Sequence, residues 1–479
     1  MGYELIITEK PAAAKKIAEA LADGKLIRET ENKVAYYKVT HKGKDLIIAC
    51  AVGHLYSVAE KEKTFNYPSF EIEWVPASEV DKNASYSKKY LTVIKKLAKK
   101  AESFTVACDY DIEGEVIGLN IILLACKQKD AQRMKFSTLT KPDLVQAYAT
   151  KQKTIDWGQA KAGETRHFLD WLYGINLSRA LITSIKKAGR YKTLSIGRVQ
   201  GPALKLIVNK EKEIKKFVPV PYWQLQLLGA LNKNPIEAWH EKDKFQNEKE
   251  CLEVLEKTKG KDGKLADISA KQFSVAVPVP FDLTTLQTEA YRSLGINPKQ
   301  TLEIAQNLYL ESYISYPRTS SQKIPKTVGI PQILSNLTKN KEYTELAKKI
   351  LSGKMIPNEG KKTDPAHPSI FPTGLYPKVL DGREKKVYDL IVRRFLSVFG
   401  EPATRETVTL KIDVEKEIFL AKGTRTVKKG WHQFYQPHLK LEEQTLPEAK
   451  IGDTVNIKEI IKHDKETQPP KRFSPASLI

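Results

Sequence analysis

The first 150 residues alternate short apolar runs with longer amphipathic stretches, which is the pattern of strands followed by helices. The apolar run at 3–8 precedes a helical stretch with Pro11 near its first turn and Gly24 beyond its end. A second apolar run, at 103–108, precedes acidic residues and a helical stretch at 115–126. This alternation predicts an α/β domain whose sheet is largely parallel.

After residue 150 the pattern changes class several times. A basic helical part is followed by a β-patterned part, then by a second helical part with a Gly/Pro-rich loop at 353–377, and then by β patterning again. We therefore expect a multidomain α/β plus α plus β chain, in which an inserted helical domain interrupts a β domain. The predicted domains are 1–150 (α/β), 151–216 with 466–479 (helical), 217–280 with 403–465 (β-rich) and 281–402 (helical).

The charge of the chain favours a polyanionic partner. Lys and Arg number 79 against 57 Asp and Glu, which gives a formal net charge of +22 that is spread along the whole chain. A Lys/Glu-rich thermophilic surface is the alternative, but such surfaces usually balance their signs. A folded and evenly basic protein most simply binds nucleic acid.

The cysteines and the apolar runs indicate the compartment. Cys50, Cys108, Cys126 and Cys251 are far apart and form no CxxC pair, so neither a zinc site nor a disulfide framework is expected. The amino-terminal residues lack a signal-peptide pattern, and the run at 116–126 is too short to cross a bilayer. We expect a cytoplasmic protein without zinc and without a membrane partner.

An acidic cluster follows the two apolar runs of the α/β part. Asp109, Asp111 and Glu113 stand at alternate positions, so an extended backbone would point all three side chains to one side. Glu9 ends the first apolar run, and the carboxyl ends of parallel strands meet at one edge of a sheet. Four converging carboxylates favour a hard divalent cation, usually Mg²⁺, beside a phosphate substrate. A solvated acidic loop is the alternative.

These residues carry a family resemblance. LIITEKP and ACDYDIEGEVIG together resemble the TOPRIM domain that topoisomerases, bacterial primases and some nucleases share. The resemblance implies that Glu9 acts near the scissile phosphate and that Asp109, Asp111 and Glu113 carry metal. It also implies that Lys10 helps to stabilise the transition state.

A tyrosine segment at 312–322 distinguishes among these classes. A free tyrosine has a pKa near 10, so it attacks phosphorus only with help from a neighbouring group. Arg318 lies two residues from Tyr316, and its guanidinium can donate a pair of hydrogen bonds to a phosphate. A polar surface turn is the alternative. SYPRTSS resembles the Tyr-x-Arg-Thr motif of type IA DNA topoisomerases, which implies that Tyr316 is the nucleophile, linked to a 5′ phosphate, and that Arg318 holds that phosphate. Tyr313 lies outside the motif and is expected to pack.

Further segments resemble the same family in the same order. LSIGRVQGPAL, RHFLDWLYGINLSRAL, DPAHPSIFPTG and TQPPKRF are four such matches. The third implies that His367, and more loosely Asp364, lies near the active site. The others imply contacts with single-stranded DNA by Ser195, Arg198, Gln200, Arg166, Asp170, Arg179, Thr467 and Arg472.

The resemblance spans essentially the whole chain and implies a ring of domains that opens to pass a strand. It points to the archaeal topoisomerase I or topoisomerase III-like branch, related to the topoisomerase module of reverse gyrase. The implied activity is ATP-independent relaxation of negatively supercoiled DNA, with Mg²⁺ as the cofactor, in the nucleoid. The sequence contains no GxxxxGK[ST] motif, so no ATP site is expected.

Two alternatives stay open at this point. The family continues beyond the helix turn that SPASLI predicts at the end of the sequence, so a second chain or a missing segment is expected to complete the domain. The chain is then either the topoisomerase part of a split reverse gyrase with a helicase partner, or a single-stranded DNA-binding subunit that is inactive until complemented. A primase or nuclease is weakest, because neither accounts for Tyr316, Arg318 and GRVQ together.

Overall fold

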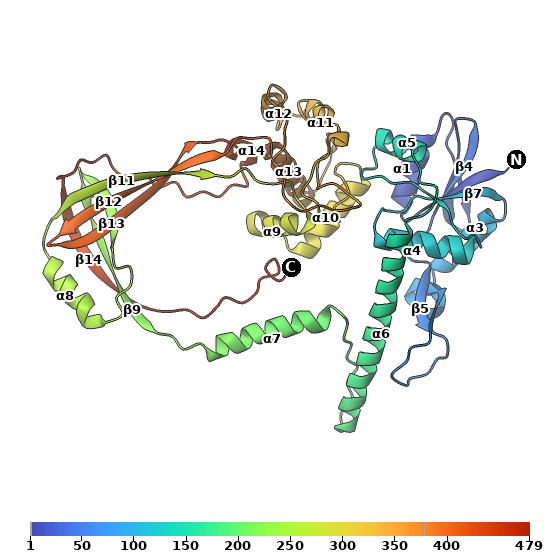
Figure 1. The fold of residues 1–479 in the computed structure, drawn as a ribbon, viewed down its shortest axis with the longest axis horizontal. Helices are drawn as coiled ribbons and strands as arrows, with labels where there is room; N and C mark the ends of the chain where they lie inside the picture. Colours follow the sequence, from blue (N-terminus) through green and yellow to red (C-terminus); the bar gives the residue numbers. More distant parts are fainter. Residues whose placement is uncertain (1, 378) are drawn as a thin grey trace.

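The computed structural model describes residues 2–377 and 379–479, and its elements are arranged as a ring (Figure 1). The α/β domain lies at one end of the ring and a β barrel lies at the other. A domain of short helices joins them along one side, and two long helices join them along the other. This arrangement agrees with the ring expected from the sequence. None of the described helices is long and apolar enough to cross a membrane.

The α/β domain is built on a six-stranded sheet of order β2-β3-β4-β1-β7-β8. β1 pairs in parallel with both β4 and β7, β7 pairs in parallel with β8, and the β2–β3 and β3–β4 pairs are antiparallel. The parallel centre confirms the expected α/β pattern. Its strands are β1 (Tyr3–Thr8), β2 (Ile27–Glu31), β3 (Val34–His41), β4 (Lys44–Cys50), β7 (Ala101–Val106) and β8 (Gln132–Arg133).

Helices cover both faces of this sheet because its central strands are apolar on both faces. On β1, Ile6 joins the core under α1 and α5, whereas Leu5 and Ile7 join the core under α3 and α4. The helix predicted at 115–126 forms as α4 and ends in a π-helical turn at Ile121–Ala125. The helices are α1 (Pro11–Leu21), α2 (Ala77–Val80), α3 (Ser87–Ala98), α4 (Ile112–Asn120) and α5 (Lys141–Ala149).

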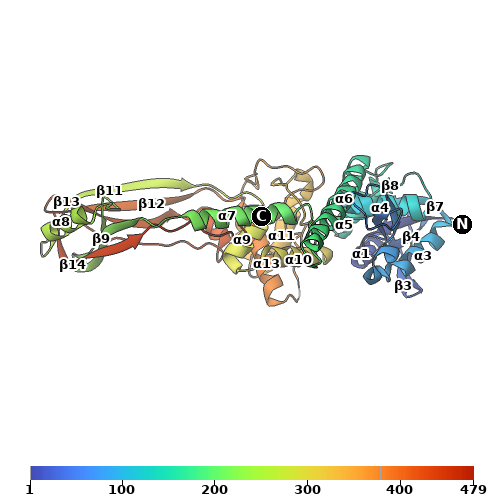
Figure 2. The same cartoon turned by 90° about the horizontal axis from the view of Figure 1, so that it is seen from below.

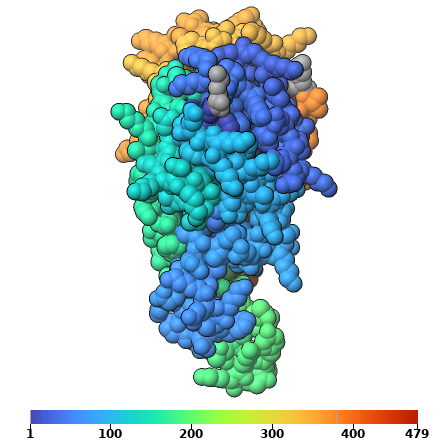
Figure 3. Space-filling model, turned by 90° about the vertical axis from the view of Figure 1, so that its right-hand side faces the viewer, coloured from blue at the N-terminus to red at the C-terminus, as the bar shows by residue number. Residues whose placement is uncertain are grey.

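A hairpin of β5 (Tyr56–Glu60) and β6 (Ile72–Pro76) extends from this domain beside the long helix α6 (Trp157–Lys187). In Figure 3 the residues around this hairpin lie next to the carboxyl-terminal end of α6. Hydrogen bonds from Arg179 to Glu60 at 2.7 Å and between Asn176 and Ser69 join the two. Helix α7 (Gln200–Lys216) follows, and none of its residues is buried.

The β domain is a closed barrel of order β10-β13-β12-β11-β14-β9. Alternate apolar residues on each strand fill its interior, as in Leu225, Leu227 and Leu231 of β9. α8 (Glu248–Thr258) lies in the connection from β10 to β11. The strands are β9 (Pro221–Leu231), β10 (Asn234–His240), β11 (Gly263–Val275), β12 (Ala403–Val414), β13 (Glu417–Lys428) and β14 (Thr454–Glu466).

The inserted domain is helical, and its first helix is fixed at both ends. Asp282 caps α9 by accepting from the Thr285 backbone N–H at 2.7 Å, and Gly295 ends that helix in a left-handed conformation. Its helices are α9 (Leu283–Leu294), α10 (Pro298–Leu310), α11 (Ile330–Leu337), α12 (Thr344–Leu351) and α13 (Gly382–Ser397).

One segment departs from the predicted β-rich range 403–465. Trp431, Phe434 and Tyr435, in and beside the short helix α14 (His432–Tyr435), belong to the core that contains α13 rather than to the barrel. His438 contacts Asp389 of α13 through its Nε2 at 2.7 Å. The strand pattern of the flanking residues concealed this excursion, because four residues are too few to show helical periodicity.

Candidate active site

The site lies where the ends of β1 and β7 meet the helical domain. Glu9 and Lys10 follow β1, and Asp109 follows β7, so the parallel pairing of these strands brings the three side chains together. Lys10 Nζ pairs with Glu9 Oε1 at 2.9 Å and with Asp109 Oδ2. The strand-end convergence that the sequence indicates is therefore present for Glu9 and Asp109.

Tyr316 reaches these acids from the other side of the interface. Its hydroxyl donates to Asp111 Oδ2, its backbone N–H donates to the Ser137 carbonyl at 2.8 Å, and the residue is 2% exposed. Asp111 also caps α4 by accepting from the backbone of Glu113 and Gly114. The tyrosine and the acids thus share one buried site although about two hundred residues separate them in sequence.

Tyr309 is a site residue that the sequence interpretation missed. Its hydroxyl donates to Asp109 Oδ1 at 3.0 Å, and its ring lies edge-on to that of Tyr316 with the centroids 5.1 Å apart. One tyrosine among the apolar residues of a helix carries no sequence signal of this contact. Tyr313 packs as expected, with its ring 6.3 Å from that of Tyr388.

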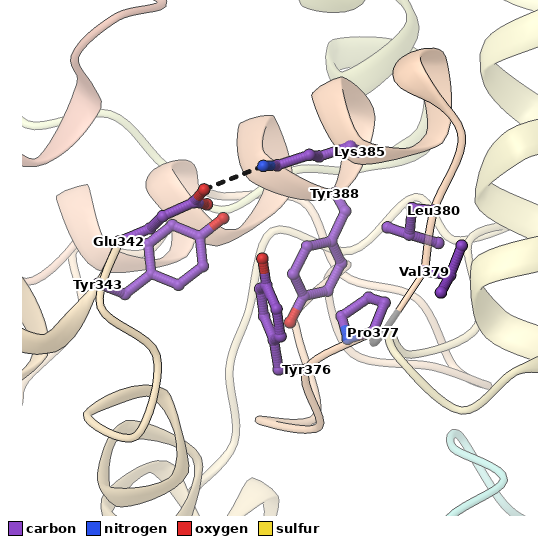
Figure 4. A pocket seen from close by; sticks show the side chains of 8 residues that line it. All are labelled: Glu342, Tyr343, Tyr376, Pro377, Val379, Leu380, Lys385 and Tyr388. Atoms are coloured by element: carbon purple, nitrogen blue, oxygen red, sulfur yellow. Dashed lines mark hydrogen bonds and ion pairs between the residues drawn. The ribbon is translucent and has the colours of Figure 1, made fainter.

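Tyr388 also lines a separate pocket of about 280 Å³ (Figure 4). Its lining includes Lys385 and Glu342, which are joined by an ion pair of 3.0 Å, and the rings of Tyr343, Tyr376 and Tyr388. None of the acids that surround Tyr316 lines this pocket. The pocket is therefore separate from the candidate active site.

The electrostatics of the site follow from burial and crowded negative charge. Burial and then the charge of Asp109 raise the pKa of Glu9. Burial alone would lower the pKa of Lys10, but Asp109 and Glu9 outweigh it and raise that pKa. Burial, followed by the charges of Asp109 and Asp111, raises the pKa of Tyr316 far above its ordinary value. In this conformation Lys10 is charged and Tyr316 keeps its proton.

His367 lies against the tyrosine as the resemblance implied. Its ring centroid is 4.6 Å from that of Tyr316, and its Nδ1 is 3.0 Å from Ser137 Oγ. Burial lowers the pKa of His367 to about 4, so the imidazole is neutral near pH 7. Its buried Nε2 has no hydrogen-bond partner among the described residues. Asp364 shapes this loop by accepting from the backbone of Ala366 and His367.

Glu113 has its contacts outside the group of Glu9, Lys10 and Asp109 in this conformation, and its expected part in a metal site stays a prediction. The helix α4 begins at Ile112, and the extended backbone that would have kept the alternation ends at Asp111. Glu113 instead contacts His54 and His167, and hydrogen bonds with these two histidines lower its pKa. Arg166 Nη1 also lies 3.1 Å from Glu113 Oε1.

The remaining candidate residues are spread over the ring. Arg318 is exposed, and within 2–377 and 379–479 no ion pair involves it. Arg198 forms a two-pronged contact with Asp170 at 2.7 and 3.3 Å, which places the GRVQ segment beside α6. Ser195 and Gln200 are exposed near the start of α7.

Three more of the residues assigned to DNA contact also have protein partners in this conformation. Arg179 binds Glu60, Thr467 exchanges hydrogen bonds with the backbone of Val220, and Arg472 binds Glu211 of α7. Arg179 and Thr467 therefore join segments of the protein. Arg472 lies on the surface at 72% side-chain exposure.

Comparison with known proteins identifies the family. A family model described as a DNA topoisomerase matches residues 154–479, and one described as a Toprim domain matches residues 4–139. DNA topoisomerase 1 of Pyrococcus horikoshii is 47% identical, covering 99% of this chain and 70% of its own length. That of Methanocaldococcus jannaschii is 48% identical, covering 99% of this chain and 62% of its own length.

A solved structure gives the same result. The full-length topoisomerase I of Thermotoga maritima matches with a TM-score of 0.72 and 25% identity, over 99% of this chain and 74% of that one. The Toprim match is consistent with a divalent metal. None of these matches supports a helicase partner or a second chain. The chain therefore belongs to the type IA DNA topoisomerases, which are isomerases that act on DNA.

Proposed function

We propose that this chain relaxes negatively supercoiled DNA without ATP, by cutting one strand, passing another through the break and resealing it. The observation that carries this proposal is the hydrogen bond from Tyr316 to Asp111, beside Glu9, Lys10 and Asp109. A buried tyrosine whose pKa is strongly shifted beside clustered carboxylates and a lysine is typical of a functional site.

Tyr316, Asp111 and Glu9 each have a separate role in the proposed transesterification. The Tyr316 oxygen forms a bond to phosphorus while its proton passes to Asp111, which already accepts the hydrogen bond. The bond from phosphorus to the 3′ oxygen breaks, and that oxygen takes a proton from Glu9, whose raised pKa favours the protonated form. Resealing runs the same steps in reverse. One phosphodiester replaces another, so no nucleotide is hydrolysed.

Cations offset the charge that gathers on the phosphoryl oxygens. Lys10 lies beside Glu9 and Asp109, and the exposed guanidinium of Arg318 has the fork geometry that suits a phosphate. Glu9, Asp109 and Asp111 would provide the oxygen ligands that Mg²⁺ prefers, because their carboxyl groups lie in one site with Lys10 and Tyr316. Bound there, Mg²⁺ would supply additional positive charge near the phosphate.

Single-stranded DNA is proposed to follow α6 and α7. Residues 151–216 contain fifteen lysines and arginines and five acidic residues, so nearly half of the excess of +22 lies in this segment. Tyr173 and Tyr191 are 42% and 72% exposed, as a base-stacking surface requires. Arg166 lies on α6, and Arg198, from the segment before α7, contacts Asp170 of that helix. Phosphate contacts of this kind make binding strongly salt-dependent.

The test is the covalent adduct. The protein is incubated with Mg²⁺ and single-stranded DNA labelled at its 3′ end, then denatured and separated by size. We expect a labelled adduct with the wild type and with Tyr313→Phe, and none with Tyr316→Phe, although Tyr316→Phe still binds the DNA. An adduct that persists in Tyr316→Phe would exclude this tyrosine as the nucleophile. A wild type that binds DNA and never forms the adduct would favour the binding-subunit alternative.

A further inference from the structure

Two histidines that have no part in the chemistry described so far contact Glu113, an acid of the expected metal motif. His54 comes from the loop after β4, Glu113 from the first turn of α4, and His167 from the middle of α6. Both histidine Nε2 atoms approach the same oxygen, Glu113 Oε2, at 3.0 and 2.9 Å. Among the described residues this is the one group of three potential ligand atoms that all lie within 4.8 Å of one another. We propose that His54, Glu113 and His167 bind a divalent transition-metal ion of the zinc or cobalt class.

The spacing of the three atoms suits such an ion. Ligands about 2.1 Å from a tetrahedral ion lie roughly 3.4 Å from one another. The two nitrogen–oxygen distances are within about half an ångström of that value, so small side-chain rotations suffice to accommodate the ion. The side chains of His54, Glu113 and His167 are 31%, 34% and 29% exposed, which leaves access for the ion and for a water as the fourth ligand.

The ligand types select the class of metal. Two imidazoles and one carboxylate suit Zn²⁺ and Co²⁺, whereas Mg²⁺ prefers oxygen ligands alone. Arg166 lies on the other oxygen of Glu113 at 3.1 Å, so it opposes a cation there but also holds the carboxylate with Oε2 toward the histidines. Trp74 packs on the His167 ring at 5.4 Å and limits its rotation.

The site differs from the carboxylate site in position and in consequence. Glu113 turns toward α6, whereas Glu9 and Asp109 surround Lys10 and Asp111 contacts Tyr316. An ion held by His167 would fasten α6 to the α/β domain at the helical turn that also carries Arg166 and Asp170. It would therefore fix the position of α6, which the GRVQ segment contacts through the ion pair between Arg198 and Asp170.

The test uses Co²⁺, whose visible absorption reports its ligands. The untagged chain is titrated with Co²⁺ in excess Mg²⁺, which occupies sites made of carboxylates alone. We expect one equivalent of Co²⁺ to bind with visible bands. Even outer-shell partners change metal affinity by roughly 10- to 100-fold. His54→Ala and His167→Ala should therefore each weaken binding by about tenfold or more, while His463→Ala in the barrel should not.

A ligand exchange separates coordination from a merely structural role. His167→Cys keeps a metal ligand but replaces nitrogen with sulfur, so we expect Co²⁺ binding to persist with a new thiolate charge-transfer band in the near ultraviolet. Far-ultraviolet circular dichroism identifies any variant that fails to fold. Unchanged Co²⁺ affinity in folded His54→Ala and His167→Ala, or no thiolate band in His167→Cys, would overturn the proposal. The binding measurement does not depend on DNA cleavage.

Discussion

At the scale of single residues, one hydroxyl group holds Asp109 in place. Tyr309 is 1% exposed and donates to Asp109 Oδ1, while Lys10 occupies Oδ2 of the same carboxylate. We expect Tyr309→Phe to slow formation of the covalent adduct, because a hydrogen bond to a charged group contributes about 1.5–3 kcal/mol and its loss frees Asp109 to rotate. The measurement is the single-turnover rate of adduct formation on single-stranded DNA.

Tyr313→Phe is the matched control for this change. Tyr313 is three residues from Tyr316 and half-buried, and it packs on Tyr388 rather than on the acids. Its variant should form the adduct at the wild-type rate. Equal rates for Tyr309→Phe and Tyr313→Phe would show that the hydroxyl of Tyr309 does not position Asp109.

His367 gives a prediction for stability against pH. Burial lowers its pKa from an ordinary value of 6.5 to about 4 in the folded chain. As the pH falls below 6.5, His367 becomes protonated in the unfolded chain but stays neutral in the folded chain. The free energy of unfolding therefore decreases until about pH 4. The pKa difference corresponds to about 3 kcal/mol. Between pH 7 and 4.5, thermal unfolding should shift down further for the wild type than for His367→Gln, and parallel pH profiles would contradict this.

The site residues differ in how much the sequence revealed about them. Glu9, Asp109 and Tyr316 stand in short local patterns, in which a strand end or a neighbouring arginine already indicates the chemistry. Tyr309, His54 and His167 carry no such pattern, because their roles come from side chains that only the folded chain brings near. A lone histidine or tyrosine is ordinarily a packing residue, so sequence alone could not have selected them.

At the scale of elements, α6 packs closely against α4 because Gly163 of α6 has no side chain at the contact. A Cβ atom on Gly163 would lie 2.4 Å from both the Ile112 carbonyl oxygen and Val116 Cγ2. The backbone oxygen cannot move aside without displacing the start of α4, which carries Glu113. We therefore expect Gly163→Ala to destabilise the chain by about 1–3 kcal/mol and to weaken single-stranded DNA binding, as α6 moves away.

Gly174→Ala on the same helix is the control. The nearest atom to its Cβ would be the Ile196 carbonyl oxygen at 3.7 Å, an ordinary contact. Alanine is the better helix former, so this variant should be neutral or more stable by up to about 1 kcal/mol. Thermal unfolding and fluorescence anisotropy with labelled DNA measure both effects. A Gly163→Ala variant as stable as Gly174→Ala would show that the α4–α6 contact adjusts freely.

Element boundaries explain the principal difference between prediction and structure. Alternation in the sequence treats 109–113 as one extended segment, but Asp111 caps a helix that starts at the next residue. Gly114 permits that start, because a Cβ there would lie 2.0 Å from the Asp109 carbonyl oxygen. Both the capping residue Asp111 and Gly114 are present in the sequence. Had these two signals been given more weight than the alternation, the prediction would have placed Glu113 on a helix, facing α6.

At the scale of the whole molecule, the ring is closed at the active site. The α/β domain and the inserted helical domain meet through polar contacts, among them Lys135 with the Pro365 carbonyl at 3.2 Å and Ser137 with His367. A cavity of about 930 Å³, lined in part by α1, α5 and residues 325–336, lies in the same interface. Apolar residues of both domains also belong to one core cluster, so separating the domains exposes apolar surface as well as polar groups.

Opening must precede DNA entry, because Tyr316 is 2% exposed in the closed ring. Ser312 Oγ donates to the Leu139 carbonyl across the interface at 3.0 Å, and both residues are buried. Removing this hydroxyl in Ser312→Ala costs the closed state about 1 kcal/mol, which is about fivefold in the opening equilibrium. We expect the amide of Tyr316, which donates to the Ser137 carbonyl, to exchange its hydrogen about fivefold faster.

Ser293→Ala isolates the interface from a general loss of stability. Ser293 Oγ donates to the Glu289 carbonyl at 2.8 Å within α9, so its loss leaves the interface intact. Hydrogen exchange of a peptide spanning 312–316 should accelerate in Ser312→Ala only, and the adduct should form faster wherever opening limits its rate. Unchanged exchange in Ser312→Ala would show that the hydrogen bond from Ser312 to Leu139 does not hold this interface closed.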